Sequence, residues 1–432
     1  MNVIRRIEVL WLALALLPGP ALGQVKIGRV AGAPGSLAAS AGVAFQASGN
    51  TGYLSNPGSG LIQKFRTTTG EVLASLQLAP GVGSITLSPD ERTLAVVGVS
   101  AQKVYLVNTA DLTVKKELTV AGSGYTVRSN VVITSDNLTV MIADPPRNGV
   151  DAFNLVDGSY DRLIPAGLNP MILTRTLTPQ GEERMGVLAS GKFSDDEKSV
   201  HVIDTRTLAV VETRVLSATT ESFNNVQFGG DGRNQYLIVP AYDSNSLQIL
   251  TLNGSGVLAS RASGGKGPSK VLTSPNGRYL AVINATSKSV ELLSVPELFV
   301  VRDIPLSDSD FTVDTTLAFS PDSRTLFIPS LNTGEVILYD VEGGAIKKRI
   351  AVGERPVSVS VSGDGAVAAL VNTGSNDLAL VAVSPLPLYV PHLVQSATDY
   401  SGIALANFGA EQANVALVAR DNAGKMLAGT AN

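Results

Sequence analysis

Residues 317–330 read LAFSPDSRTLFIPS, and this line of sequence decides the fold because it recurs along the chain. It returns as VLTSPNGRYLAVIN at 271–284, as TLSPDERTLAVVG at 86–98 and as SVSGDGAVAALVN at 360–372. Each copy reads as two strands around a turn, because apolar runs flank a cluster of Pro, Gly, Asn and Asp residues. Eight copies align on one turn position, which is occupied by Ser48, Asp90, Asp136, Gln180, Asp231, Asn276, Asp322 and Asp364.

The spacing of the copies predicts the architecture. Successive turn positions lie 42 to 51 residues apart, and a period in the mid-forties built from short strands is the length of one four-stranded propeller blade. Residues 316–352 show the four strands as TLAFS, TLFIPS, EVILYDV and AIKKRIAVG, with a turn signal between each pair. We therefore predict an all-β protein, a β-propeller of four-stranded antiparallel blades whose turn aspartates are structural, each bonding to backbone two residues on.

The two ends of the repeat region complement each other. An unpaired strand at 24–30 precedes the first copy, whereas the last copy, 357–383, supplies three strands and then runs into Pro385 and Pro387. An N-terminal strand that completes the last blade would leave no sheet edge open at the seam. Eight blades are favoured, and seven stays an alternative because the third and fourth copies are degenerate.

The termini predict two further segments. Residues 1–23 combine Arg5 and Arg6 with an apolar run at 9–17 and small residues before Gln24, which is typical of a secretory signal peptide and is too short to span a bilayer. The domains are therefore a signal peptide (1–23), a β-propeller (24–385) and a C-terminal module (386–432). The last segment reads as three or four strands, which predicts a partial β-sandwich.

Composition narrows the environment and the partners. The chain has 432 residues, a net charge of −4 and no cysteine. A mildly acidic chain without basic runs argues against a nucleic-acid partner. A secreted protein without disulfides depends on a large core and on ring closure for stability. We expect a secreted, periplasmic or cell-surface monomer with no membrane span after signal cleavage.

Several phrases resemble the YVTN family of bacterial β-propeller repeats. They are SVHVIDTRTLAVVETRVL, FSPDSRTLFIPS and GEVILYDVEGGAIKKRIAVGERPVSVSVSGDG, within about residues 25–384. Val202, Ile203, Asp204 and Thr205 match the third-strand pattern of the family, and Gly353 with Pro356 matches its exit loop. The chain departs from the pattern at 328–330, which read IPS where the family often has VAN. The resemblance implies a WD40-like propeller and carries no shared catalytic set.

Motifs for catalysis and cofactor binding are sparse. Only His201 and His392 are present, neither with a partner at triad or metal-ligand spacing, and no HExxH, GxSxG or cysteine pair occurs. We therefore predict no catalytic residue and no cofactor. Asp308, Asp310 and Asp314 cluster in SDSDFTVD, where clustered oxygens suit a hard cation. A solvated acidic loop is the favoured interpretation there, because no glycine marks the sharp turn of a calcium loop.

Topology indicates where a ligand would bind. In a propeller the loops from fourth to first strands and from second to third strands lie on one face, where binding residues gather. The residues of this chain that we predict for a protein or glycan partner on that face are Asn169, Tyr242, Asp243, Lys266, Asn284, Asn332, Arg355 and Asn372; Asn56, Asp144 and Arg147 also fall there.

The predicted function is a secreted, non-catalytic propeller scaffold that binds a protein or glycan through this face. One alternative is a lactonase-type hydrolase, which some similar secreted propellers are; His201 on a third strand, away from the axis, counts against it. The other is a propeller subunit of a quinoprotein-dehydrogenase-like complex, which the chain resembles in repeats only.

Overall fold

The computed structural model describes residues 25–383, apart from 33–36, 39, 127–128, 179, 194–195, 217–221, 224, 231–234, 253–256, 296, 307 and 313. These residues belong to one compact unit, Gln24–Leu386. The predicted signal peptide (1–23), the C-terminal module (386–432), His392 and the turn residue Asp231 lie outside the described residues. The described part of the chain contains no helix of the length and apolarity that a membrane span requires.

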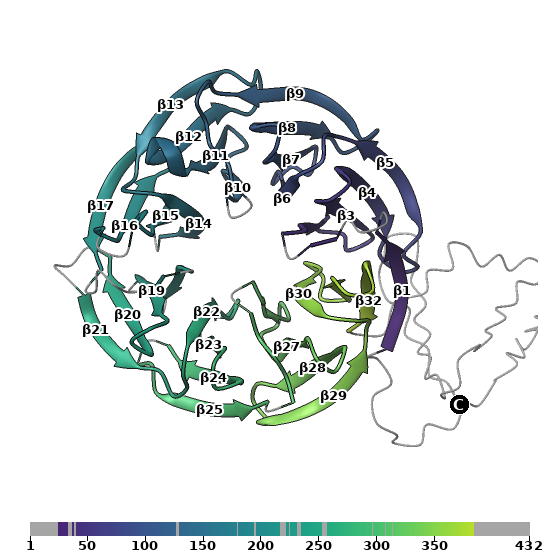
Figure 1. Cartoon of the computed structure of the whole chain (residues 1–432), viewed down its shortest axis with the longest axis vertical. Helices are drawn as coiled ribbons and strands as arrows, with labels where there is room; N and C mark the ends of the chain where they lie inside the picture. Colours follow the sequence, from purple (N-terminus) through teal and green to yellow (C-terminus); the bar gives the residue numbers. More distant parts are fainter. Residues whose placement is uncertain are drawn as a thin grey trace, which may run out of the picture. The chain divides into compact units, whose positions relative to one another are not determined.

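Eight four-stranded antiparallel sheets are arranged in a ring about a common axis (Figure 1). The prediction of a propeller is confirmed, and eight blades are present rather than seven. The degenerate third and fourth copies each form a complete blade, because the antiparallel pairing of their strands is retained where the turn sequence has drifted.

We number the blades along the chain and give their strands from the innermost to the outermost. Blade 1 has β2 (Val43–Phe45), β3 (Thr51–Asn56), β4 (Leu61–Arg66) and β5 (Val72–Gln77); blade 2 has β6 (Val82–Leu87), β7 (Thr93–Gly98), β8 (Lys103–Asn108) and β9 (Thr113–Thr119); blade 3 has β10 (Val131–Ile133), β11 (Thr139–Asp144), β12 (Gly149–Asn154) and β13 (Tyr160–Pro165); blade 4 has β14 (Pro170–Leu177), β15 (Glu183–Ala189), β16 (Ser199–Asp204) and β17 (Ala209–Val215).

The second half of the ring follows the same order. Blade 5 has β18 (Gln227–Gly230), β19 (Gln235–Ala241), β20 (Ser246–Thr251) and β21 (Val257–Ala262); blade 6 has β22 (Pro268–Thr273), β23 (Tyr279–Asn284), β24 (Ser289–Ser294) and β25 (Val300–Pro305); blade 7 has β26 (Ala318–Phe319), β27 (Thr325–Ser330), β28 (Glu335–Asp340) and β29 (Ala345–Ala351); blade 8 has β30 (Pro356–Val361), β31 (Val367–Asn372), β32 (Asp377–Ala382) and β1 (Val25–Ala31).

The hydrophobic core lies between blades rather than inside one of them. Second strands such as β7, β27 and β31 are buried along their whole length, whereas the outermost strand β9 is exposed at nearly every position. One cluster joins Tyr53 and Ile62 of blade 1 to Leu94 and Val96 of blade 2. A blade therefore buries both of its faces on its neighbours, which is why its middle strands read as continuous apolar runs.

The first strand of the chain closes the ring. β1 pairs antiparallel with β32, from Val25 opposite Ala382 to Ala31 opposite Asp377. Val30 is fully buried in the cluster that joins blade 8 to blade 1, and the Arg29 guanidinium lies 2.6 Å from the Asp377 carboxylate. The predicted seam is confirmed, with its strand one residue further along the chain than expected.

The recurrent Ser-Pro-Asp line builds the turn between the first and second strands of a blade. In blade 7 the Ser320 hydroxyl donates to Asp322 Oδ1 (2.5 Å) and accepts the Thr325 N–H (2.9 Å), while Asp322 Oδ1 also accepts the Arg324 N–H (3.1 Å). The same bonds recur around Ser88, Thr134, Ser274 and Ser362. The turn aspartates thus bond to backbone two residues on, as predicted.

The buried turn serine gives a stability prediction. Ser320→Ala would leave the Thr325 N–H without its partner and would remove one of the two hydrogen bonds that Asp322 Oδ1 accepts. We therefore expect a loss of about 1 to 3 kcal/mol in the free energy of unfolding. Urea denaturation measures it. Ser358→Ala, in β30, serves as the control, because that hydroxyl makes no hydrogen bond with a described residue, and it should change stability by no more than about 0.5 kcal/mol. Equal effects of the two substitutions would contradict the role of the turn.

Candidate functional site

We call the loop face the side of the ring that carries the hairpins between second and third strands and the loops between fourth and first strands. The Ser-Pro-Asp turns lie on the opposite side, the turn face, because each blade is an antiparallel meander. The loop face holds all of the residues predicted to bind a partner, so its geometry decides what those residues can do.

Side chains of the hairpins hold the connecting loops in place. In four blades the last hairpin residue is a Gln or Asn with a left-handed backbone, and its side-chain oxygen accepts a backbone N–H from the loop that leaves the same blade. The four pairs are Gln102 with Tyr125 (2.8 Å), Asn148 with Asn169 (3.3 Å), Asn245 with Gly267 (2.7 Å) and Asn376 with Leu37 (2.8 Å). We call these contacts loop clamps.

The predicted binding residues divide into two groups by burial. Asp243, Lys266, Asn332 and Arg355 are exposed on the loop face, and Tyr242 and Asn169 are half-buried. The Tyr242 hydroxyl lies 3.1 Å from the Thr286 hydroxyl. The Asn169 amide donates to the Ser190 hydroxyl (3.0 Å) and to the Gly191 carbonyl (2.8 Å). This group is placed to meet a partner.

The second group lies beneath the surface. Asn284 and Asn372 end strands β23 and β31 and have no exposed surface. The Asn372 amide donates to Asp377 Oδ1 (2.8 Å) and to the Val352 carbonyl (3.2 Å), and Asn284 Oδ1 accepts the Ser263 hydroxyl (2.6 Å). These asparagines organise the loops from below, and a macromolecular partner would not touch them without a rearrangement.

The acidic loop between blades 6 and 7 pairs its carboxylates with separate partners. Asp308 contacts Arg349 (2.8 Å), and Asp310 contacts Lys288 (2.5 Å) and the Asn332 amide (2.6 Å); Asp314 is exposed. Among the described residues no group of three or more His, Cys, Asp or Glu side chains is placed to hold a metal ion. The structure therefore does not bring Asp308, Asp310 and Asp314 together as a cation site.

A buried ionic cluster lies at the loop-face end of blade 3. Asp144 ends β11, a short 3₁₀ turn (η1, Pro145–Arg147) follows, and Asp151 lies on β12. Both carboxylates have no exposed surface. Arg147 lies 2.8 Å from Asp151 and 3.6 Å from Asp144, and the Tyr125 hydroxyl donates to Asp151 (2.9 Å). Topology placed Asp144 and Arg147 on this face, whereas Tyr125 and Asp151 were not predicted as part of it.

Burial sets the protonation of this cluster. It raises the pKa of Asp151 to about 6, and the nearby Asp144 charge adds to the rise, while the Tyr125 hydroxyl and Arg147 oppose it. Burial and the Asp151 charge together raise the pKa of Tyr125. One guanidinium thus faces two buried carboxylates, one of which takes up a proton in mild acid.

The raised pKa of Asp151 predicts a pH dependence. Between about pH 4 and pH 6 the folded chain keeps a proton that the unfolded chain has released, so the contribution of Asp151 to stability falls as pH rises through this window. The fall is at most about 3 kcal/mol, because one pKa unit is worth about 1.4 kcal/mol. Asp151→Asn should remove it in urea denaturation at pH 4.5 and pH 7. Asp157→Asn, at an exposed turn of the same blade, is the control and should keep the fall in stability between the two pH values. If Asp151→Asn showed the same fall as the wild type, the prediction would be wrong.

His201 lies on the third strand of blade 4, as predicted. Its Nε2 is 2.9 Å from the Ser199 hydroxyl and its Nδ1 is 3.1 Å from the Thr213 hydroxyl. Burial lowers its pKa, so the imidazole is neutral at neutral pH. Its two described polar neighbours are hydroxyls, and no described carboxylate orients it as a general base would require.

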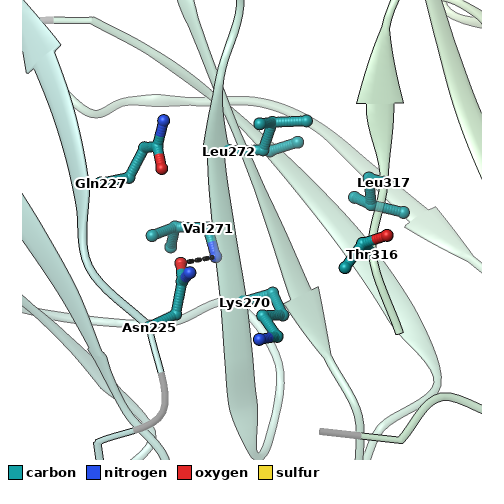
Figure 2. Close-up of a pocket in the computed structure, with 8 residues that line it drawn as sticks. Asn225, Gln227, Lys270, Val271, Leu272, Thr316 and Leu317 are labelled. Carbon is teal, nitrogen blue, oxygen red and sulfur yellow. Dashed lines mark hydrogen bonds between the residues drawn. The ribbon is translucent and has the colours of Figure 1, made fainter. Parts of the chain in front are cut away.

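A cavity of about 130 Å³ is lined by residues of blades 5 and 6 and of the segment that leads into blade 7. Its lining residues come from β18 and the segment before it, from β22 and β23, and from the segment before β26; Figure 2 shows seven of them with labels. Asn225, Gln227, Lys270 and Thr316 supply polar groups, and Leu272 and Leu317 supply apolar ones. No sequence motif predicts this cavity, because its lining residues come from three different copies of the repeat.

Comparison with known proteins supports the fold and goes no further. No family model and no curated protein sequence matches the chain. Solved structures do match: the C-terminal WD40 domain of Sif2 (TM-score 0.64, 10% identity, 84% of this chain and 99% of that one) and Kuenenia stuttgartiensis hydrazine synthase (0.52, 15%, 86% and 99%). The dihydro-heme d1 dehydrogenase NirN matches with a TM-score of 0.58 and 14% identity over 72% of this chain and 66% of that one. The class that these comparisons show is the β-propeller fold.

Proposed function

We propose that the chain is an exported YVTN-type propeller that acts as a non-catalytic scaffold and binds a protein or a glycan on its loop face. The observation that carries the proposal is the set of four loop clamps. A partner would meet four loops that are each held at one backbone N–H group, and such preorganisation lowers the conformational entropy that binding costs. The N-terminal segment 1–23 supports export, and the proposal takes the mature protein as a monomer.

One exposed aromatic residue supports a contact surface on this face. Phe193 follows β15 on the loop face and is 71% exposed. Its backbone N–H and that of Lys192 both donate to Asp196 Oδ2 (2.8 and 2.6 Å), so the turn that presents the ring is held. Leu168, from the preceding loop, is also exposed and bonds through its carbonyl to the Gly191 N–H (3.0 Å). Aromatic anchors ringed by polar groups are a common basis of recognition.

A capture experiment with matched variants tests the proposal. The purified protein is used to capture partners from envelope extracts and on a glycan array, alongside Phe193→Ala, Arg355→Ser and Phe299→Ala. Phe299 is also 71% exposed but lies on the turn face between β24 and β25. We expect Phe193→Ala to weaken capture at least tenfold and Phe299→Ala to leave it unchanged. The reverse result would place the binding surface on the turn face and overturn the proposal.

A hydrolase assay tests the non-catalytic part. The environment of His201 gives no ground for proposing lactone hydrolysis, because the ring is half-buried between two hydroxyls. We expect no turnover of a panel of lactones at high protein concentration. Turnover that His201→Gln abolishes would overturn the assignment as a scaffold.

A further inference from the structure

We propose that the outer edge of blade 4 binds an extended, uncharged peptide segment of another protein, which pairs with β17 as an additional strand. The proposal concerns the rim of the ring rather than the loop face, so it stands independently of the proposed function. It rests on a strand edge without guarding charges, on an apolar groove beside that edge, and on the local neutralisation of the nearby charges.

The outer edge of β17 is open. β17 is the outermost strand of blade 4, and in the sheets that the described residues form it pairs with β16 alone. Proteins commonly guard such an edge with exposed charged side chains or with proline, because its free N–H and C=O groups can pair with another strand. Other outermost strands follow this rule: β9 exposes Lys115 and Lys116, and β25 exposes Arg302 and Pro305.

The exposed positions of β17 carry no such guard. They are all uncharged, and they are occupied by Ala209, Val211, Thr213 and Val215. Val211 and Val215 are 53% and 52% exposed, and valine and threonine favour the extended backbone of a strand. β5 has no charged residue either, so the edge alone does not single out β17. The surface beside the edge does.

An apolar groove of about 430 Å³ lies beside the start of β17. One wall is the part of β13 from Arg162 to Pro165, and the other comprises Leu208, Ala209 and Val210. β13 and β17 are outermost strands that follow one another along the rim of the ring (Figure 1). Every lining residue except Arg162 has an apolar side chain, so the groove suits apolar side chains of a ligand.

One face of β17 points toward blade 3 and hence toward this groove. Val210 packs against the hydrophobic cluster that joins blades 3 and 4. The Thr213 hydroxyl lies 3.1 Å from His201 Nδ1, and a Cβ at Gly167, in the loop that leaves blade 3, would lie 2.5 Å from His201 Nε2. A strand added to β17 would continue this face with every second side chain.

An added strand would therefore be recognised in two ways. Its backbone would bond to the open edge of β17, and its alternate side chains would enter the groove between β13 and β17. In recognition by strand addition, main-chain hydrogen bonds give affinity and pockets for alternate side chains give specificity.

The charges around the edge are neutralised locally, which favours an uncharged partner. Arg162, the one ionisable residue among the described residues of the groove wall, lies 3.3 Å from the Asp161 carboxylate. Glu212 and Arg214 of β17 form an ion pair with each other. The Thr213 carbonyl accepts one hydrogen bond from Arg214 (3.1 Å) and keeps a second lone pair. A charged segment would lose hydration here without gaining a free counter-charge.

A synthetic peptide tests the inference on the full chain. The probe is a fluorescein-labelled heptapeptide, Thr-Ile-Thr-Ile-Thr-Ile-Thr amide, and its binding is measured by fluorescence polarisation. One control peptide carries a methyl group on every peptide nitrogen, so that it keeps the side chains but cannot donate to a strand. The other control has glutamate in place of isoleucine. We expect each control to bind at least tenfold more weakly than the probe.

Variants of the chain locate the binding edge. Val211→Lys and Val215→Lys place an ammonium group on the edge, and each should weaken binding of the isoleucine peptide at least tenfold. Val72→Lys, at an exposed valine of β5 (41%), is the matched control and should leave binding unchanged. All three positions are exposed, so we expect thermal unfolding at the wild-type temperature, and a loss of binding then reports the edge.

Several outcomes would overturn the inference. They are no binding of the isoleucine peptide, equal binding of the methylated peptide, tighter binding of the glutamate peptide, and binding that Val211→Lys and Val215→Lys leave unchanged. Elution of the full chain from a sizing column as a dimer that Val211→Lys converts to a monomer would show that a second copy covers the edge instead. None of these results bears on capture by the loop face, which Phe193→Ala tests separately.

Discussion

Removal of β1 should abolish cooperative folding of the whole ring. A chain without Val25–Ala31 loses the six ladder pairs with β32, the buried Val30 side chain and the ion pair between Arg29 and Asp377. Domains of this kind are stable by only about 5 to 15 kcal/mol in total, and the loss also opens the cluster between blades 8 and 1. We expect no sharp thermal transition by circular dichroism, and self-association on a sizing column, because β32 becomes an open edge.

A peptide added in trans makes this prediction specific. A synthetic peptide of residues 24–32 should restore a cooperative transition and the monomeric elution volume when mixed with the shortened chain. The same peptide with Gly28→Val should fail, because a Cβ at this glycine would lie 2.8 Å from the Thr69 carbonyl group. A shortened chain that stays monomeric with an unchanged melting temperature would contradict the role of β1 as the closing strand.

Arg147→Met should be the most damaging single substitution of a charged side chain on the loop face. It removes the cation from two carboxylates that have no exposed surface, Asp144 and Asp151. Breaking a buried ion pair costs about 3 to 5 kcal/mol, because the remaining charge stays desolvated. Urea denaturation at pH 7 measures the loss. The loss should shrink toward pH 4.5, since a protonated Asp151 no longer needs a counter-charge.

Two further variants separate charge from packing at this site. Arg162→Met removes an exposed arginine of the same blade, whose partner Asp161 is also exposed, and should cost less than about 1 kcal/mol. Adding Asp144→Asn and Asp151→Asn to Arg147→Met should recover much of the lost stability at pH 7. A loss in Arg147→Met that is the same at both pH values and survives neutralisation would show that the arginine acts through packing alone.

The fold was predictable because its evidence is repeated eight times. One Ser-Pro-Asp turn is a weak signal, but copies at a period in the mid-forties leave few alternatives. Closure by β1 was predictable as well, since a lone strand at one end and a blade of three strands at the other satisfy each other. Blade number was harder to fix, because it depends on units such as that around Gln180, where turn chemistry has drifted while strand pairing persists.

The site was predictable only in outline. Topology assigns a residue to the loop face but does not say whether its side chain is exposed or buried. Asn284 and Asn372 were therefore predicted as binding residues together with Lys266, although they are buried. A clue existed for the ionic cluster, since Asp144, Arg147 and Asp151 flank one short hairpin; Tyr125, its fourth member, comes from the loop before the blade. The cavity collects residues from three repeats, and no single-repeat pattern contains it.

Because the loop clamps bind backbone N–H groups, the position of a loop does not depend on its own exposed side chains. Each clamp holds a backbone N–H, that of Leu37, Tyr125, Asn169 or Gly267, and the side chain doing the holding sits in the neighbouring hairpin. Exposed side chains along these loops can therefore be exchanged while the path of the main chain is kept. New binding specificities are therefore best sought by varying the exposed loop residues between the clamps while the four hairpin side-chain amides are retained.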